Sequence, residues 1–288
     1  MNTKVYDRKT KKTINEKSPS GANFLYNKKF GRIILKLVNK RFISSVAGFY
    51  MNRKISTIHI NNFIKDNKID MSDYENVKYK SFNNFFSRKI KNGKRKFDMN
   101  KDNFVSPADS KLIIYKIDKN KEFIIKNKTY TREPILRDKK LAEEYKNGYF
   151  MVFRLSVDDY HRYAYIDDGV VLYQKNIKGI YNTVGPIAFN HFKVYEENHR
   201  YYQVMNTANF GQIIQMEVGA LLVGKIVNNN KKEFMKGEEK GYFLFGGSTI
   251  IVIVKENTIK IDEDILSNSL NNIETKVKQG EKIAKKIR

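Results

Sequence analysis

Residues 240–255 read KGYFLFGGSTIIVIVK, so the tetrapeptide GGST divides two short apolar runs. The runs at 242–245 and 249–254 are rich in Tyr, Phe, Ile and Val, which favour β-strands. Glycine permits backbone angles that a side chain forbids, and the two glycines before Ser248 leave the carbonyl of Gly247 sterically open. Taken alone, the tetrapeptide predicts a hairpin turn between two strands.

Similar β-like runs continue along the chain from about residue 104, and they are bounded by Gly, Asn, Asp or Lys. They lie at 111–115, 123–125, 149–155, 169–173, 203–205, 212–218 and 221–227. The C-terminal stretch 266–287 is polar with weak helical periodicity, and we expect it to pack on the outside. Residues 101–288 are therefore predicted to form a β-rich domain.

The first hundred residues have a different, mainly helical pattern. Apolar side chains recur at helical spacing between 30 and 38, with basic residues between them, which predicts a basic amphipathic helix. Shorter helical patterns follow at 56–64 and 81–88. We expect residues 1–100 to form a basic helical region, so the fold class is α+β.

The positive charge is concentrated in the N-terminal arm, residues 1–55. The whole chain carries 55 Lys and Arg against 31 Asp and Glu, a formal net charge of +24. The arm contains 14 basic residues and only two acidic residues, Asp7 and Glu16, so its formal net charge is +12. An amphipathic basic helix can lie on an anionic membrane, and it can equally pack on its own domain with a solvated basic face. No zinc-finger spacing or RNP-like motif favours nucleic acid, and no run approaches the ~20 apolar residues of a spanning helix.

Several kinds of chemistry are excluded by composition. Without Cys, the chain has no disulfide, thiolate metal site or cysteine nucleophile. Its four histidines are too few and too scattered to predict a histidine-built metal site, so we expect no metal. They are His59, His161, His191 and His199.

Three residues could together activate a hydroxyl group. Asp109 ends the Pro-led turn SPAD, His161 lies in a polar loop after a strand, and Ser248 follows the two glycines. Taken singly, each is an ordinary turn or loop residue. Together, Ser248, His161 and Asp109 supply a nucleophile, a base and a group that orients the base.

The motifs around these residues resemble the signature blocks of phosphatidylserine decarboxylases. The blocks are SFNNFF (81–86), SPAD (106–109), DYHR (159–162), MEVGALLVGKI (216–226), KGEEKGYF (236–243) and GGST (246–249). They occur in the order of that family, and the resemblance covers residues 24–288.

The resemblance implies a self-processing proenzyme. His161, oriented by Asp109, would take the proton of Ser248 so that its oxygen attacks the carbonyl of Gly247. Cleavage between residues 247 and 248 would give chains 1–247 and 248–288. Ser248 would become a pyruvoyl group, which forms a Schiff base with phosphatidylserine and allows loss of CO2 to give phosphatidylethanolamine.

The resemblance also implies partners and a location. We expect phosphatidylserine and an anionic membrane surface as partners, no nucleic acid, and a peripheral position on the cytoplasmic face of the cell membrane. A homodimer of two-chain units is compatible with this expectation. Two departures stand out: Ala164 occupies the place where some members carry a second His, and Ser110 stands where Gly is common.

Two alternatives remain open from the residues. One is a non-enzymatic basic protein that binds membranes or nucleic acid, in which GGST is merely a turn. The other is a pyruvoyl-dependent decarboxylase of a soluble amino acid, which the basic amphipathic helix disfavours.

Overall fold

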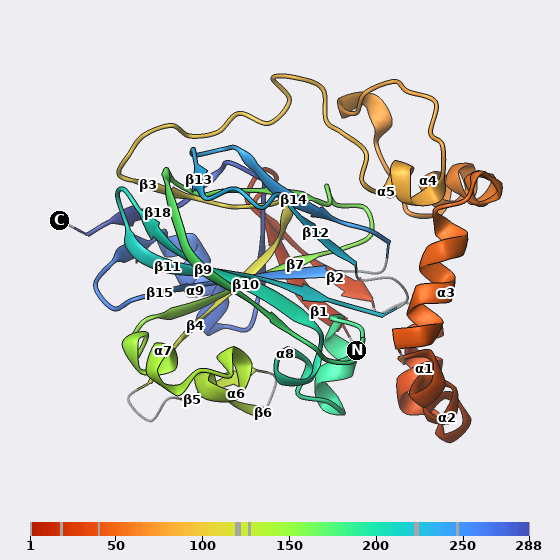
Figure 1. The fold of residues 1–288 in the computed structure, drawn as a ribbon, viewed down its shortest axis with the longest axis horizontal. Coiled ribbons are helices and arrows are strands. Elements are labelled where there is room, and N and C mark those ends of the chain that lie inside the picture. Colours follow the sequence, from red (N-terminus) through yellow and green to blue (C-terminus); the bar gives the residue numbers. More distant parts are fainter. Residues whose placement is uncertain are drawn as a thin grey trace.

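A computed structural model describes residues 2–17, 20–39, 41–118, 122–125, 128–221, 225–245 and 248–287 (Figure 1). Helix makes up 27% and strand 36%, which confirms the predicted α+β, β-rich class. Its helices are α1 (Ser20–Asn27), α2 (Lys29–Val38), α3 (Arg41–Met51), η1 (Lys54–His59), α4 (Ile60–Asp66), η2 (Met71–Asp73), α5 (Phe82–Phe86), α6 (Arg132–Leu136), α7 (Lys139–Glu144), η3 (Pro186–Asn190), α8 (Val194–Glu197) and α9 (Glu263–Leu270).

The described strands form one large sheet and several small ones. They are β1 (Asn2–Asp7), β2 (Lys12–Lys17), β3 (Asn103–Val105), β4 (Ser110–Lys116), β5 (Glu122–Ile125), β6 (Lys128–Thr131), β7 (Tyr149–Leu155), β8 (Arg162–Ala164), β9 (Gly169–Ile177), β10 (Arg200–Thr207), β11 (Gly211–Gly219), β12 (Ile226–Asn228), β13 (Glu233–Phe234), β14 (Glu239–Phe243), β15 (Ser248–Val254), β16 (Ile259–Ile261), β17 (Glu274–Val277) and β18 (Lys282–Lys286). The large sheet has the order β13-β9-β10-β11-β15-β7-β4-β17-β1-β2. Smaller sheets are β12-β14-β8, β16-β18-β3 and β5-β6.

Strand β15 lies in the middle of the large sheet, antiparallel to β11 on one side and β7 on the other. Every residue of β15 is buried, and successive side chains enter different cores. Ile251 and Ile253 join the core that includes helices α6, α7 and α8, whereas Ile250 and Val252 join the core beneath the small sheets. Because successive side chains of a strand point to opposite faces, β15 contributes to the core on each face of the sheet.

The helical region packs at one end of the sheet through an aromatic cluster (Figure 1). Phe82, Phe85 and Phe86 of α5 are buried there beside Tyr160, which directly precedes His161. The predicted helices at 30–38, 56–64 and 81–88 correspond to α2, to η1 with α4, and to α5. None of the helices in the described residues is long and apolar enough to cross a bilayer.

Two sequence predictions about the chain ends were wrong. Residues 2–17 are not helical, since β1 and β2 form a hairpin at the edge of the large sheet. The C-terminal stretch does not only pack on the outside, because β17 lies between β4 and β1 within that sheet. Both segments are also joined to the middle of the sheet by ionic contacts, because Arg154 of β7 bonds Glu274 of β17 and Glu16 of β2.

Candidate active site

Ser248 is the first residue of β15, where it pairs with Gly219 of β11 and Leu155 of β7. Its side chain is fully buried, and its Oγ has no hydrogen-bond partner among the described residues. A buried hydroxyl without a partner is energetically unfavourable and is expected mainly where function requires it. Gly247, the residue that Ser248 is predicted to attack, lies outside the described residues.

His161 lies at the end of the loop that leaves β7, and its side chain is buried. Its Nδ1 is 2.9 Å from the main-chain oxygen of Asp159. Because a carbonyl oxygen can only accept, Nδ1 carries the proton in the neutral ring, and Nε2 keeps its lone pair. Nε2 has no partner in the described part of the chain, so it is available as a base.

The surroundings of His161 keep the imidazole neutral. Burial, together with the nearby positive charge of Arg88, lowers the pKa of His161 to about 3. The ring of Phe86 lies 4.0 Å from the imidazole, centroid to centroid, and contributes to this burial. At neutral pH the side chain is therefore an uncharged proton acceptor.

The loop that carries His161 is fixed by a buried ion pair. The carboxylate of Asp159 accepts from Nζ of Lys111 at 2.7 Å and from the backbone N–H of Ser156 at 2.8 Å. Burial opposes ionisation, but these contacts outweigh it and lower the pKa of Asp159 to about 2. Asp159 thus fixes the loop with its side chain and His161 with its carbonyl.

Asp109 forms hydrogen bonds with residues other than His161. Its buried carboxylate accepts from Arg95 at 2.7 Å, from Nζ of Lys278 at 2.9 Å and from the backbone N–H of Gln279 at 2.9 Å. Each hydrogen bond that the described residues make to this carboxylate comes from one of these three. Among the described residues Asp109 thus makes no hydrogen bond to His161, and an orienting role for Asp109 stays a prediction.

Gln279 connects the SPAD turn, which carries Asp109, to the DYHR segment, which carries His161. Its Nε2 donates to the carbonyl of Pro107 at 3.2 Å and to that of Arg162 at 3.1 Å. The backbone N–H of Ala164 also donates to Pro107, at 3.0 Å. Asp109 can thus influence His161 through Gln279 and the start of β8, and it is best described as a positioning residue.

Two hydrogen bonds hold the segment that precedes Ser248 close to His161 and to α5. The N–H of Phe243 donates to the carbonyl of His161 at 2.9 Å, five positions before Ser248. The N–H of Phe245 donates to Oδ1 of Asn83 at 3.0 Å, and the Phe245 ring packs on Phe86. Helix α5 therefore contacts both the segment before Ser248 and the imidazole.

Sequence reasoning missed several of these residues. Asn83 belongs to the block SFNNFF, for which no role was predicted, and no role was predicted for Lys111, Arg88 or Gln279. Their contacts span 48 to 172 positions in the chain, from Lys111–Asp159 to Gln279–Pro107. The local signal was the pair Asn83 and Asn84 between the aromatic residues of α5.

Comparisons with known proteins identify the family of this chain. A family model described as phosphatidylserine decarboxylase matches residues 82–285. Phosphatidylserine decarboxylase proenzyme 2 of Clostridium acetobutylicum is 52% identical over 286 residues, covering 98% of each chain. The proenzyme of Clostridium tetani is 42% identical over 99% of this chain and 98% of its own, and that of Fusobacterium nucleatum is 41% identical over 97% and 94%. Neither alternative left open by the sequence has support here, and the chain belongs to the phosphatidylserine decarboxylase family of carboxy-lyases.

Proposed function

We propose that this chain is a self-cleaving proenzyme that decarboxylates phosphatidylserine to phosphatidylethanolamine and CO2. The observation that carries the proposal is the pair of buried, unpartnered atoms Ser248 Oγ and His161 Nε2. Both lie within residues 82–285, which match the model of a family named for this activity.

Self-cleavage needs only groups that the chain supplies. His161 Nε2 accepts the Ser248 proton while Oγ attacks the Gly247 carbonyl carbon, and the amide bond gives way to an ester. Removal of the α-proton of residue 248 then breaks the ester bond by elimination. The carboxylate of Gly247 leaves with chain 1–247, and a dehydroalanine remains at residue 248. Addition of water and loss of ammonia convert it to a pyruvoyl group.

The surroundings of residue 248 fit such a group. A pyruvoyl carbonyl supplies an acceptor for the electron pair released when an amino acid loses CO2. The protein supplies a fixed position, because β15 is paired on both sides and fully buried. Burial of Ser248 also keeps bulk water from the reacting atoms.

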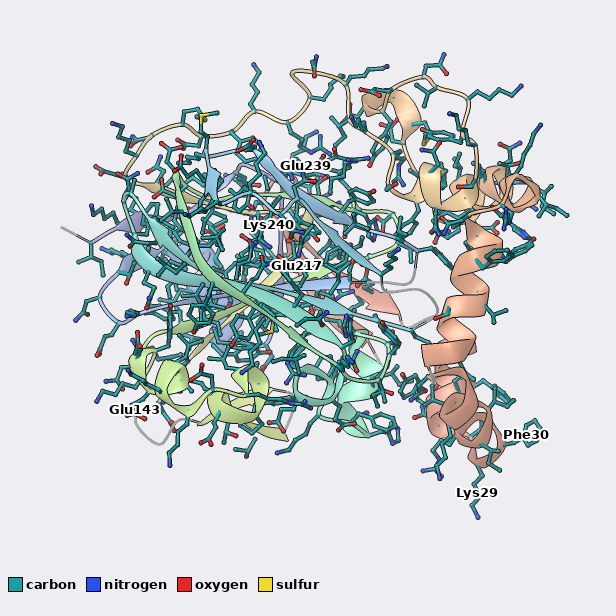
Figure 2. All side chains as sticks on the ribbon, viewed as in Figure 1. Lys29, Phe30, Glu143, Glu217, Glu239 and Lys240 are labelled. Atoms are coloured by element: carbon teal, nitrogen blue, oxygen red, sulfur yellow. The ribbon has the colours of Figure 1, made fainter. Side chains whose placement is uncertain are left out.

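We also propose that the helical region holds the enzyme on the cytoplasmic face of the cell membrane. Leu35 of α2 is buried, but Phe30 and Ile33 of the same helix are 67% and 60% exposed. Figure 2 shows Lys29 and Phe30 projecting from the end of α2, away from the sheets. Exposed apolar side chains beside basic ones are typical of a helix that lies on anionic lipid.

The test measures mass and product on one purified sample. The expected result is conversion of the 33.9 kDa chain into a large fragment and a 41-residue fragment, 248–288, of roughly 5 kDa whose N-terminus is blocked. The same sample should form phosphatidylethanolamine from phosphatidylserine vesicles and no ethanolamine from free serine. An active but uncut chain would overturn the self-cleavage, and turnover of free serine alone would favour the soluble-substrate alternative.

A further inference from the structure

A polar cavity of about 640 Å³ lies beside the proposed active site. It is lined by α5, by the β9 and β10 strands, and by β12 and β14 of the small sheet. The polar groups that matter here are Asn83, Asn176, His199, Tyr201, Lys225 and Tyr242. No described residue that lines the cavity is an Asp or Glu.

The cavity is linked to Ser248 by two short connections. The carbonyl of His199 accepts from the N–H of Gly219 at 2.9 Å, and Gly219 is the strand partner of Ser248. On the other side, Asn83 both lines the cavity and holds the N–H of Phe245. A molecule in the cavity would therefore lie next to the segment that ends at the cleavage site.

The lining suits a ligand that carries negative charge and several hydrogen-bonding groups. Lys225 is exposed and forms no ion pair with any described residue. Ammonium, amide and phenol groups donate hydrogen bonds to phosphate and carboxylate oxygens, whereas a carboxylate in the wall would repel them. The amide oxygens of Asn83 and Asn176 can accept from an ammonium group.

The cavity also reaches the surface that we propose to face the membrane. Asn52, which lines it, directly follows α3. Near this position Phe49 and Ile55 are 61% and 62% exposed. A headgroup in the cavity could therefore remain attached to acyl chains that leave past Asn52 into the lipid layer.

From this placement we propose that the cavity binds the phosphoserine headgroup of the lipid substrate, with Lys225 contacting the phosphate. The inference rests on the proposed function for the identity of the lipid. Its location rests on the lining and on the two connections to Ser248.

The first experiment measures binding without catalysis. In the uncut Ser248→Ala chain, calorimetry should detect binding of sn-glycero-3-phosphoserine. The added substitution Lys225→Met should weaken this binding roughly tenfold, because one charge-assisted hydrogen bond is lost. Lys260→Met is the matched control, because Lys260 is an exposed residue of β16, a strand that does not line the cavity. It should leave binding unchanged. Inorganic phosphate alone should bind more weakly than the full headgroup.

The second experiment uses the self-cleaving enzyme with Ser248 intact. Lys225→Met should still cut itself completely, raise KM for phosphatidylserine roughly tenfold and leave kcat within about twofold. Equal binding by the Lys225→Met and parent chains, or equal binding of phosphate and headgroup, would overturn the proposal. Headgroup binding by the Ser248→Ala chain, together with no phosphatidylethanolamine formation by the cleaved chain that keeps Ser248, would overturn the proposed function while leaving the cavity assigned.

Discussion

Glu217 on β11 and Lys240 on β14 form an ion pair of 2.7 Å in which both side chains are fully buried (Figure 2). Strand β11 pairs with β15, which begins at Ser248, and β14 pairs with β8, which follows His161. Nδ2 of Asn228 donates to the second oxygen of Glu217 at 3.0 Å. The pair therefore links the strand beside the nucleophile to the small sheet beside the base.

Removal of one partner of this pair should be costly. Lys240→Met leaves a buried carboxylate without its cation, and burial already raises the pKa of Glu217. We expect the free energy of unfolding to fall by about 3–5 kcal/mol, and the double variant Glu217→Leu/Lys240→Met to recover most of it. Urea denaturation in the uncut Ser248→Ala background measures both.

The exposed pair between Lys255 and Glu144 provides a matched control. Lys255→Met should change the free energy of unfolding by no more than about 1 kcal/mol. A Lys240→Met effect no larger than that of Lys255→Met would show that the buried pair does not hold the two sheets together.

Ser248→Ala should give an uncut and inactive chain, because the only other hydroxyl that β15 carries is that of Thr249. Thr249 is buried next to Ser248, and its Oγ1 also lacks a partner among the described residues. Thr249→Val should therefore cut normally, since its side chain points to the opposite face of the strand. Intact-mass measurement distinguishes the two; a cut Ser248→Ala chain would remove Ser248 from the mechanism.

The sequence predicted elements with a clear period or a local motif. β15 was found from an uninterrupted apolar run, β7 from a run interrupted only by Arg154, and His161 and Ser248 from the blocks around them. β17 was missed because its residues 274–277, ETKV, look like a polar surface segment, and their burial depends on Arg154 of β7, 120 positions away from Glu274. The partners of Asp109 were missed for the same reason, because contacts between distant segments leave no local pattern.

Two variants test whether Asp109 acts on His161 through Gln279 or by direct contact. Asp109→Asn should lower the free energy of unfolding by about 2–3 kcal/mol, because the buried end of Arg95 loses its main anion. Asp109→Asn should also slow self-cleavage. If Asp109 acts through Gln279, then Gln279→Leu should slow self-cleavage by a factor similar to that of Asp109→Asn, in a time course followed by gel or mass. Normal cleavage by Gln279→Leu together with slow cleavage by Asp109→Asn would contradict this route.

The buried His161 should make stability depend on pH. Its folded-state pKa of about 3 lies below the ordinary value of 6.5, so the unfolded chain binds the proton more readily. The contribution is fully present above pH 6.5 and is lost as pH falls toward 3, with a slope of up to about 1.4 kcal/mol per unit. Asp159, with a pKa of about 2, adds its own loss only below its ordinary value of 3.8.

Comparison of Ser248→Ala with Ser248→Ala/His161→Phe between pH 6.5 and 4.5 isolates this effect, since the other histidines are common to both proteins. The difference in the free energy of unfolding should change steadily across the window, because only the parent loses the contribution of His161. Parallel pH profiles would mean that His161 is accessible to protons in the folded protein.

Membrane binding should depend on the apolar face of α2. A test that removes residues 1–55 is unsuitable, because β1 and β2 belong to the large sheet. The better variant is Phe30→Ser/Ile33→Ser, which keeps the charge, and its control is Met235→Ser/Leu270→Ser, two residues that are 68% and 77% exposed elsewhere. Burial of one large apolar side chain in lipid contributes about 1.5–3 kcal/mol, so binding to vesicles should fall at least tenfold for the first variant alone.

Vesicles of phosphatidylcholine and phosphatidylglycerol, free of phosphatidylserine, keep this measurement independent of the headgroup cavity. Co-sedimentation should also weaken as salt is raised, because the basic residues around Phe30 and Ile33 act over a Debye length of about 10 Å at 0.1 M salt. Equal losses in the α2 variant and its control would indicate a general effect of removing surface apolar groups. Unchanged binding by the α2 variant would place the membrane contact on another part of the protein.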